Sequence, residues 1–400
     1  MSTTIKNAVV RDSALRFRYD VFGGLCWFPH GEIFHLTSNE TAILDLAKDP
    51  LDLACVGNLM TSREAVHASR NLLERGLIRK TKASTPRRRS IDSKRVSKEI
   101  EDSRAQPINK PFWSHIQPFR FCNQRCIHCY CDGGNHQEGF ELPITTWRSI
   151  VDTICDFGVL EIYITGGENL IVEDCYALTK YIIDKGLGTG LSTNAMHVTG
   201  EVLERLKDFE LEFIQVSLDA ASPELNDAIR GKHGAWKRTI AGIQLLKTVM
   251  KPVINCVVSK HNIQEVRELV LLGVSLGVRH FKVFPQKSVG RAISQQQVLL
   301  DRGEILRLGY QCQELAAENH VSIDYLRASE NCGSGFSGFA VDQSGDMFPC
   351  IFGIADESQR VGSLLTEDLA DLWFAAPRLA KFREEPCAQP CRRCELTRHG

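Results

Sequence analysis

Six apolar, β-rich segments alternate with helix-like segments between residues 113 and 285, and this alternation limits the possible folds more than any other feature. The six segments read WSHIQPFRF, LEIYIT, GTGLST, FIQVSLD, VINCVVS and HFKVFP. Strands that alternate with helices form parallel sheets, because a parallel crossover needs a long connection. Such crossovers are right-handed, so we expect an α/β fold whose sheet curls toward a partial (βα)6 TIM-like barrel.

Four of these predicted strands are followed directly by residues suited to binding a ligand. They are Cys122 after the first strand, Gly166, Gly167 and Glu168 after the second, Ser192 to Asn194 after the third, and Ser217 and Asp219 at the end of the fourth. The carboxyl ends of parallel strands lie at one edge of a sheet, where ligands collect. The sequence therefore predicts an active site at that edge.

Three cysteines follow the first predicted strand as C-x3-C-x2-C, at Cys122, Cys126 and Cys129. A structural zinc site needs four ligands, and His128 and Cys131 would compete sterically with the wrap of the other three. A four-iron cluster held by three thiolates leaves one iron open for a substrate or a cofactor. We therefore expect an iron–sulfur cluster with one open iron.

The composition narrows the class of protein further. The chain of 400 residues has fifteen cysteines, a net charge of −1 and no export signal or apolar run long enough to span a bilayer. We therefore expect a cytoplasmic protein that uses its cysteines for metal or redox chemistry rather than for disulfides. A net charge near zero gives no global attraction for nucleic acid, and neither nucleic acid nor membrane is expected as a partner.

Together these motifs resemble the radical S-adenosylmethionine (SAM) superfamily over residues 113 to 290. In that family SAM chelates the open iron, and electron transfer splits it into methionine and a 5′-deoxyadenosyl radical. TGGENL resembles the family's Gly-Gly-Glu turn, so the resemblance assigns Gly166 and Gly167 to close approach of the ligand and Glu168 to its ammonium group.

LSTNA and VSLDAASPELNDAIRG resemble the next two motifs of the family. By that resemblance Arg230 binds the SAM carboxylate, and the residues that contact the sugar or carboxylate are Ser192, Asn194 and Ser217. Ala220 and Asn226 stand where the family usually has Gly and His, and one residue is inserted before Arg230.

A second group of cysteines lies near the carboxyl terminus. The segment CGSGFSGFAVDQSGDMFPC predicts a β-hairpin, and CAQPCRRC follows it. This pattern resembles the twitch domain, a short relative of the SPASM domain, and implies one auxiliary [4Fe-4S] cluster. The expected ligands are Cys332, Cys350, Cys391 and Cys394, with Cys387 as the alternate. A zinc site on the same thiolates is the alternative.

The first eighty residues read as three strands followed by three helices, the pattern of a winged helix. The helix expected over residues 63–77 balances basic and acidic side chains, which argues against DNA binding. VFGGLCWFPHGEIFHLTSNETAILDL resembles the PqqD-like recognition element of ribosomal peptide (RiPP) maturation. That resemblance implies that a precursor-peptide leader pairs with the edge strand at residues 32–36 and packs on the helix over residues 63–77.

These segments predict four parts. They are a recognition element over residues 1–80, a flexible linker over 81–110, the barrel over 111–310 and the auxiliary-cluster domain over 311–400. The resemblances imply a RiPP maturase that abstracts hydrogen from a precursor peptide to form a thioether, ether or carbon–carbon crosslink, with a flavodoxin or ferredoxin as electron donor.

Two alternative functions stay open from the sequence. One is a twitch-type dehydrogenase or another radical SAM enzyme that acts on a small molecule, and the other is an iron–sulfur DNA-binding regulator. No general base is identified, since nothing in the sequence distinguishes among Asp342, Asp346 and Tyr325.

Overall fold

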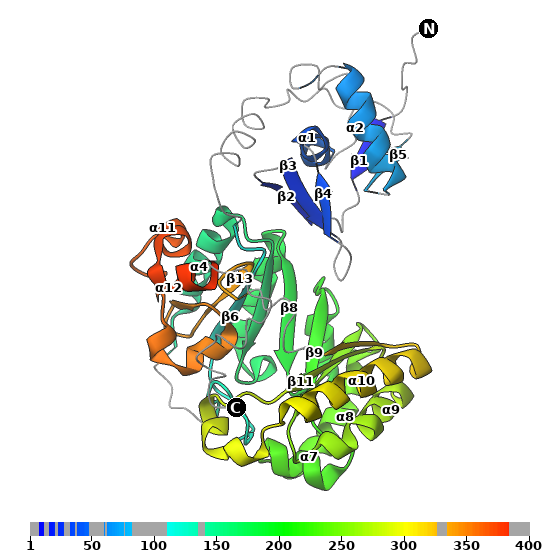
Figure 1. Ribbon diagram of the computed structural model, residues 1–400, viewed down its shortest axis with the longest axis vertical. Coiled ribbons are helices and arrows are strands. Elements are labelled where there is room, and N and C mark those ends of the chain that lie inside the picture. The colour runs from blue at the N-terminus through cyan, green and yellow to red at the C-terminus, as the bar shows by residue number, and fades with distance from the viewer. Residues whose placement is uncertain are drawn as a thin grey trace. The chain divides into compact units, whose positions relative to one another are not determined.

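A computed structural model of the chain divides into two compact units, residues 1–109 and residues 110–400 (Figure 1). The structure describes residues 8–11, 16–20, 23–27, 33–36, 38–47, 60, 62–75, 77–81, 110–134, 141–325 and 334–383. The linker predicted over residues 81–110 lies almost wholly outside the described residues.

The first unit contains two small antiparallel sheets and two described helices. One sheet has the order β2-β3-β4 and the other pairs β1 with β5, with β1 at Ala8–Arg11, β2 at Arg16–Asp20, β3 at Gly23–Trp27, β4 at Ile33–Leu36 and β5 at Ile78–Thr81. The helices are α1, Ser38–Leu46, and α2, Ser62–Glu74. The three predicted strands are present as β2, β3 and β4, and α2 corresponds to the helix predicted over residues 63–77. Of the three predicted helices, the one between α1 and α2 lies outside the described residues. The β1–β5 pair was not predicted, and the second helix ends at Glu74 rather than near residue 77.

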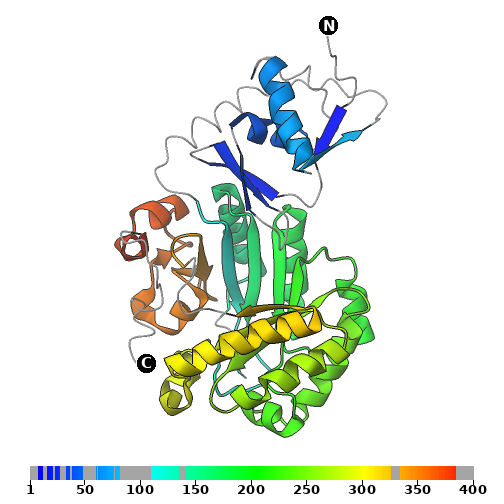
Figure 2. The same ribbon diagram turned by 45° about the vertical axis from the view of Figure 1, so that its right-hand side comes forward.

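The second unit is built on one ten-stranded sheet with the order β12-β11-β10-β9-β8-β7-β6-β13-β14-β15 (Figure 2). Its strands are β6 Trp113–Phe119, β7 Glu161–Gly166, β8 Gly188–Thr193, β9 Phe213–Ser217, β10 Pro252–Val258, β11 His280–Pro285, β12 Ser322–Tyr325, β13 Gly338–Val341, β14 Asp346–Phe348 and β15 Gly362–Ser363. β6 to β13 pair in parallel, and β14 and β15 add antiparallel pairs. The chain therefore has an α/β fold with a mostly parallel sheet.

The six strands predicted from the alternation are confirmed as β6 to β11. The predicted hairpin is also present, since Ala340 of β13 pairs antiparallel with Phe348 of β14. The sequence did not predict that β13 also pairs in parallel with β6, which continues the main sheet into the hairpin. β12 was missed because its four residues are too few to show a clear alternation.

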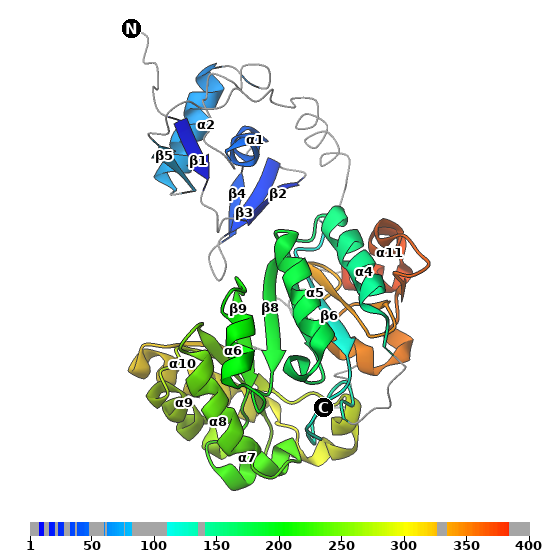
Figure 3. The same cartoon turned by 180° about the vertical axis from the view of Figure 1, so that it is seen from behind.

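Helices cover the apolar face of this sheet (Figures 1 and 3). The helices of this unit are α4 Ile144–Phe157, α5 Glu173–Asp184, α6 Gly200–Leu206, α7 Pro223–Arg230, α8 Ala235–Leu246, α9 Val266–Ser275, α10 Arg302–Asn319, α11 Leu369–Ala375 and α12 Pro377–Arg383, and its 3-10 turns are η2 Asn169–Ile171, η3 Ile263–Glu265, η4 Gly290–Val298, η5 Ile351–Ala355 and η6 Glu357–Gln359. None of the described helices combines the length and the apolar character needed to cross a bilayer.

Burial alternates along the strands and defines two faces of the sheet. Residues such as Ile162, Ile214 and Ile254 are fully buried and pack with the helices in one core, and we call this side the outer face. The residues between them, such as Tyr163 and Phe213, are half-buried and point to the opposite side, the inner face. The helices therefore leave the inner face of the parallel strands for other contacts.

Gly273 of α9 tests the packing of helices on the outer face. A Cβ atom at this position would lie 2.4 Å from the ring of Phe281 on β11, whereas one at Gly200 of α6 would meet nothing within 4 Å. We predict that Gly273→Ala lowers the free energy of unfolding by about 1–3 kcal/mol through overpacking. Urea denaturation measures the effect, and Gly200→Ala is the control, with an expected change within about 1 kcal/mol. Equal effects of the two variants would contradict the described packing.

Candidate active site

The three cysteines Cys122, Cys126 and Cys129 lie in the loop that follows β6, residues 120–134, which we call the cysteine loop. Backbone hydrogen bonds close its two ends: the Cys122 N–H donates to Gly134 O at 3.0 Å, and the Gly134 N–H donates to Arg120 O at 3.3 Å. The loop is thus a closed turn at the carboxyl end of β6.

The C-terminal turn of α7 holds the middle of the cysteine loop. The Arg125 N–H donates to Arg230 O at 3.1 Å and the Ile127 N–H donates to Ile229 O at 2.9 Å. Gly231 follows with φ +59°, and a Cβ atom there would lie 2.3 Å from Arg125 O. Only glycine allows the backbones to come this close, so the end of α7 packs directly against the cysteine loop.

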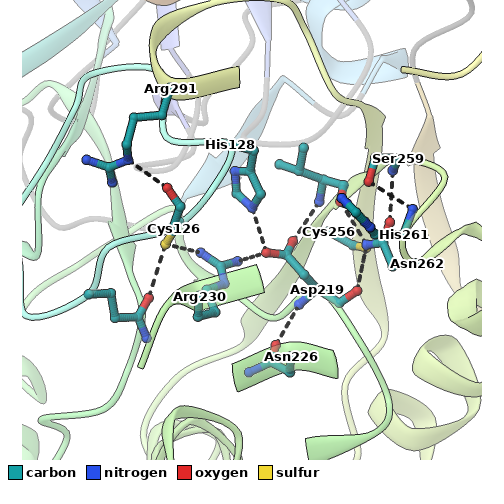
Figure 4. Close-up of polar contacts among 12 residues, drawn as sticks. Cys126, His128, Asp219, Asn226, Arg230, Cys256, Ser259, His261, Asn262 and Arg291 are labelled. Carbon is teal, nitrogen blue, oxygen red and sulfur yellow. Dashed lines mark hydrogen bonds and ion pairs between the residues drawn. The ribbon is translucent and has the colours of Figure 1, made fainter. Parts of the chain in front are cut away.

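Arg291 of η4 clamps the cysteine loop from the other side (Figure 4). Its Nε donates to Cys126 O at 2.8 Å, and its Nη1 contacts Asp132 Oδ1 at 2.6 Å and Gly133 O at 2.9 Å. Its backbone N–H donates to Cys129 O at 3.0 Å. The sequence analysis missed Arg291, because a contact between residues so far apart leaves no pattern in a single sequence.

Burial makes thiolates costly at two of the three cysteines. It raises the pKa of Cys122 to about 12 and also raises the pKa of Cys126, although the Arg230 guanidinium opposes the second shift. A hydrogen bond from the Cys131 thiol, 3.7 Å away, lowers the pKa of Cys129 to about 5. Iron binds the thiolate form, so a bound cation would supply the stabilisation that buried thiolates need.

No group of three or more His, Cys, Asp or Glu side chains within the described ranges is arranged to hold a single metal ion. In a four-iron cluster each thiolate binds a different iron, so the three cysteines need not converge on one point.

Asp219, at the end of β9, connects the cysteine loop with α7 and β10 (Figure 4). Its Oδ2 lies 2.8 Å from both His128 Nε2 and Arg230 Nη2, and its Oδ1 accepts a hydrogen bond from the Val257 N–H at 2.9 Å. Burial alone would raise the pKa of Asp219, but the charges of Arg230 and His128 outweigh it and lower the pKa. The sequence analysis placed Asp219 at the site but did not foresee this pairing.

Arg230 is buried between Asp219 and the second cysteine. Its Nη1 lies 3.7 Å from Cys126 Sγ, and its Nε has no hydrogen-bond partner in the part of the chain that the structure describes. An unpaired buried N–H favours an acceptor. The resemblance assigned Arg230 to the SAM carboxylate, and this open donor beside Cys126 suits an anionic group there.

Glu168 is fully buried and joins the ends of β7 and β8. Its carboxylate accepts hydrogen bonds from Thr193 Oγ1 at 2.5 Å, from the Asn194 N–H at 2.5 Å and from the Leu170 N–H at 3.2 Å. Burial raises its pKa more than these three donors lower it. Glu168 therefore acts on the positions of Thr193 and Asn194 in addition to any contact with a ligand.

Close backbone packing, which the sequence did not reveal, explains the two glycines before Glu168. A Cβ atom on Gly166 would lie 2.3 Å from Phe119 O, and one on Gly167 would lie 2.0 Å from Phe121 O. Gly166 also has φ +125°. Both glycines allow this turn to pack against the strand end that leads into the cysteine loop.

The four strand-end motifs meet at one edge of the sheet. The Glu168 N–H donates to Phe121 O at 2.8 Å, and Asn194 Nδ2 donates to Asn123 Oδ1 at 2.7 Å. Ser192, one residue before the end of β8, and Ser217, the last residue of β9, have half-buried side chains on the inner face. The residues predicted at the strand ends are therefore brought together at the carboxyl edge of the sheet.

The second cysteine group is only partly described. Cys350 is half-buried and follows β14. The other predicted ligands, Cys332, Cys387, Cys391 and Cys394, lie outside the described residues.

Three residues without an assigned role have partners of their own. Asp342 accepts hydrogen bonds from the Ser344 and Asp346 N–H groups at 2.9 Å, and Asp346 pairs with Arg360 at 2.8 Å. Tyr325 contacts Gln313. Asp342 and Asp346 thus shape the β13–β14 turn and its surroundings.

Comparisons with known proteins identify the class. Residues 116–273 match the sequence model of the radical SAM superfamily, and residues 332–395 match that of SPASM, an iron–sulfur cluster-binding domain. An AdoMet-dependent heme synthase from Methanosarcina barkeri is 27% identical over 302 residues, covering 68% of this chain and 85% of the synthase. Mycofactocin maturase MftC from Mycobacterium ulcerans is 28% identical over 290 residues, covering 68% of this chain and 77% of the maturase.

A solved structure has the same fold over most of the chain. Streptococcus suis SuiB bound to S-adenosylmethionine aligns with a TM-score of 0.75 at 19% identity, covering 97% of this chain and 93% of SuiB. SuiB bound to its precursor peptide SuiA aligns with a TM-score of 0.71 at 18% identity, covering 97% and 94%.

The protein is therefore an enzyme of the radical SAM type with an iron–sulfur cluster-binding domain behind its radical SAM domain. Its cofactors are a [4Fe-4S] cluster, SAM and an auxiliary cluster. The buried thiols of the cysteine loop and the open Nε of Arg230 suit such a cluster and its anionic ligand.

A variant at Asp219 tests whether its ion pair with Arg230 stabilises the fold around the site. We predict that Asp219→Ala lowers the free energy of unfolding by about 3–5 kcal/mol, because it leaves the buried Arg230 charge unpaired. The control is Asp184→Ala, which removes an exposed ion pair with Lys180 and should cost less than about 1 kcal/mol. Urea denaturation of identically prepared proteins measures both. A loss for Asp219→Ala no larger than that of the control would contradict the account.

Proposed function

We propose that the protein is a maturase of a ribosomally made precursor peptide. The observation that carries the proposal is the similarity, over most of this chain's length, to radical SAM proteins whose names and structures concern peptide maturation, MftC and SuiB with SuiA. The chemistry proposed is hydrogen abstraction from a residue of the peptide and closure of a thioether, ether or carbon–carbon crosslink. The second hydrogen would leave as a proton and one electron, which an iron–sulfur cluster of the enzyme would accept. A flavodoxin or ferredoxin is the proposed electron donor.

The residues of the site have separate roles in this proposal. When bound, the cluster and SAM supply a 5′-deoxyadenosyl radical. Cys122, Cys126 and Cys129 hold the cluster, while Arg291 and the end of α7 fix the loop that carries them. The proposed SAM contacts are Gly166, Gly167, Glu168, Ser192, Asn194, Ser217 and Arg230.

The finer architecture belongs to the same proposal. β6 to β11 form a partial (βα)6 barrel that ends near residue 310, and the segment over residues 311–400 forms a twitch- or SPASM-type hairpin domain. Its single auxiliary cluster is held by Cys332, Cys350, Cys391 and Cys394, with Cys387 as the alternate. The ordered hairpin at β13 and β14 presents Cys350 for this purpose.

The first unit serves as a PqqD-like, winged-helix recognition element. β4 lies at the edge of the sheet β2-β3-β4, so its outer backbone groups are available for pairing within that sheet. The leader of the precursor adds as a strand beside β4 and packs on α2, which follows from the way extended peptides join sheet edges. A tether of residues 81–110 raises the effective concentration of the peptide at the barrel.

A small-molecule substrate is the second candidate, and the similarity to an AdoMet-dependent heme synthase favours it. In that case the first unit has no part in substrate recognition. The two candidates differ in what happens when the first unit is removed.

The cluster assignment predicts the behaviour of a triple variant. Changing Cys122, Cys126 and Cys129 together to Ala should remove four irons per chain and abolish 5′-deoxyadenosine formation, because all three thiolates that hold the cluster are lost. Iron analysis and chromatography of the nucleoside products measure the two effects. Cys155→Ala is the control, since Cys155 lies in α4 away from the loop. Undiminished 5′-deoxyadenosine from the triple variant would refute the assignment.

The recognition role predicts a separation of activities. Deleting residues 1–80 should leave both clusters and SAM cleavage intact, because every proposed cluster and SAM ligand lies beyond residue 110, yet modification of dilute precursor should fall at least about tenfold. Within the full chain, Phe34→Pro in β4 should weaken leader binding by disturbing the pairing strand. A truncated enzyme that modifies dilute precursor at the full rate would place recognition in the second unit and favour the small-molecule candidate.

A further inference from the structure

Lys282 is a cation on the inner face of the sheet. It lies in the middle of β11 between Phe281 and Val283, which are buried on the outer face, so its own half-buried side chain points inward. Its Nζ lies 4.3 Å from the centre of the Phe213 ring on β9. The side chain therefore reaches across β10 over the inner face.

The charge of Lys282 is not matched by a carboxylate in contact with it. Asp324 on β12 is its neighbour in register and attracts it, but Lys282 forms no ion pair or hydrogen bond with any residue that the structure describes. Burial lowers the pKa of Lys282 more than Asp324 raises it. Removing a cation from water costs free energy unless an anion accompanies it.

Aromatic rings extend from this cation across the inner face. Phe213 lies 5.3 Å from Tyr163 of β7, and Tyr163 lies 5.4 Å from His115 of β6, measured between ring centres. Gly190 of β8 makes this contact possible, because a Cβ atom there would lie 2.5 Å from Phe213 and 2.8 Å from Tyr163. The rings form an aromatic wall that begins at the Lys282 ammonium and includes the hydroxyl of Tyr163, which contacts Glu161.

Polar side chains stand beside Lys282 toward the proposed SAM site. The register runs from Ser217 of β9 to Asn255 of β10 and then to Lys282, and all three are half-buried on the inner face. No side-chain hydrogen bond is recorded for Asn255 among the described residues, and its amide is a donor that a carboxylate can accept. Adjacent strands are about 4.8 Å apart, so Lys282 lies roughly 10 Å across the sheet from Ser217.

We propose that Lys282, with Asn255 beside it and the Phe213–Tyr163 wall below, forms a subsite that binds a carboxylate of the substrate. This inference rests on the proposed function and deepens it, because it names a feature of the peptide that enters the barrel. The carboxylate belongs either to an acidic side chain or to the carboxyl terminus of the peptide. Because Phe213 begins β9 and Ser217 ends it, a carboxylate held at the Lys282 ammonium anchors the peptide toward the amino-terminal ends of the strands. The rest of the peptide would then run along the inner face toward the carboxyl ends.

The subsite can be tested with small carboxylates and without turnover. The full chain, reconstituted with iron and sulfide and saturated with SAM but without reductant, is titrated with two matched pairs of probes. N-acetylphenylalanine is compared with its amide, for a terminal carboxylate, and N-acetylglutamate α-amide with N-acetylglutamine α-amide, for a side-chain carboxylate. At least one acid should bind more than about tenfold tighter than its neutral partner, and the pair that responds identifies the source of the carboxylate.

Two variants separate the subsite from general effects of charge. Lys282→Met should abolish the preference for the acid, whereas Lys260→Met, at an exposed position, should retain it in full. Neutral and acidic probes that bind equally well to the wild type would overturn the proposal, and so would a preference that survives in Lys282→Met. If Lys282→Met does not fold, the comparison of acidic and neutral probes with the wild-type protein still tests the proposal.

The result of this binding test can be distinguished from the result of the tests of the proposed function. If the enzyme modifies its peptide but shows no preference for the acidic probes, the carboxylate subsite is refuted and the maturase function stands. If the preference for acidic probes depends on Lys282 but the enzyme leaves the precursor unmodified, the carboxylate site stands and the peptide substrate is refuted.

Discussion

The buried carboxylate of Asp219 is the interaction on which the candidate site depends most. It joins the end of β9 to the backbone of β10, to the guanidinium of Arg230 on α7 and to the imidazole of His128 in the cysteine loop. A buried carboxylate and a buried guanidinium each cost free energy in isolation, but together they stabilise each other. Because α7 also holds the loop through backbone hydrogen bonds, this ion pair fixes the loop relative to the sheet.

The two faces of the sheet in the second unit differ in their side chains and in their roles. The outer face is apolar and packs under the helices, which provides most of the buried surface. The inner face carries half-buried polar and aromatic side chains, from His115 through Tyr163 and Phe213 to Lys282. The outer face thus supplies stability, and the inner face carries the side chains that we propose bind ligands.

Much of this arrangement could be predicted from the sequence, because it follows from local patterns. The βα alternation gave β6 to β11, and the C-x3-C-x2-C spacing placed the cysteine loop after the first of these strands. What could not be predicted depends on contacts between distant segments. The clamp of Arg291 on Cys126, the pairing of β13 with β6 and the burial of Glu168 against Asn194 leave no periodic signal in one sequence. The glycines at 166 and 167 were recognised, but for approach to a ligand rather than for packing against Phe119 and Phe121.

The central claim is that a radical formed at this site takes hydrogen from a peptide, and isotope transfer tests it most directly. A candidate precursor peptide, taken from a short reading frame beside the gene if one is found there, is produced with deuterated residues and incubated with the reconstituted enzyme, SAM and a reductant. The 5′-deoxyadenosine and the peptide are then analysed by mass spectrometry. The account predicts deuterium in the 5′-deoxyadenosine, together with a peptide that has lost two hydrogen isotopes for each crosslink. Unlabelled 5′-deoxyadenosine with an unchanged peptide would contradict it.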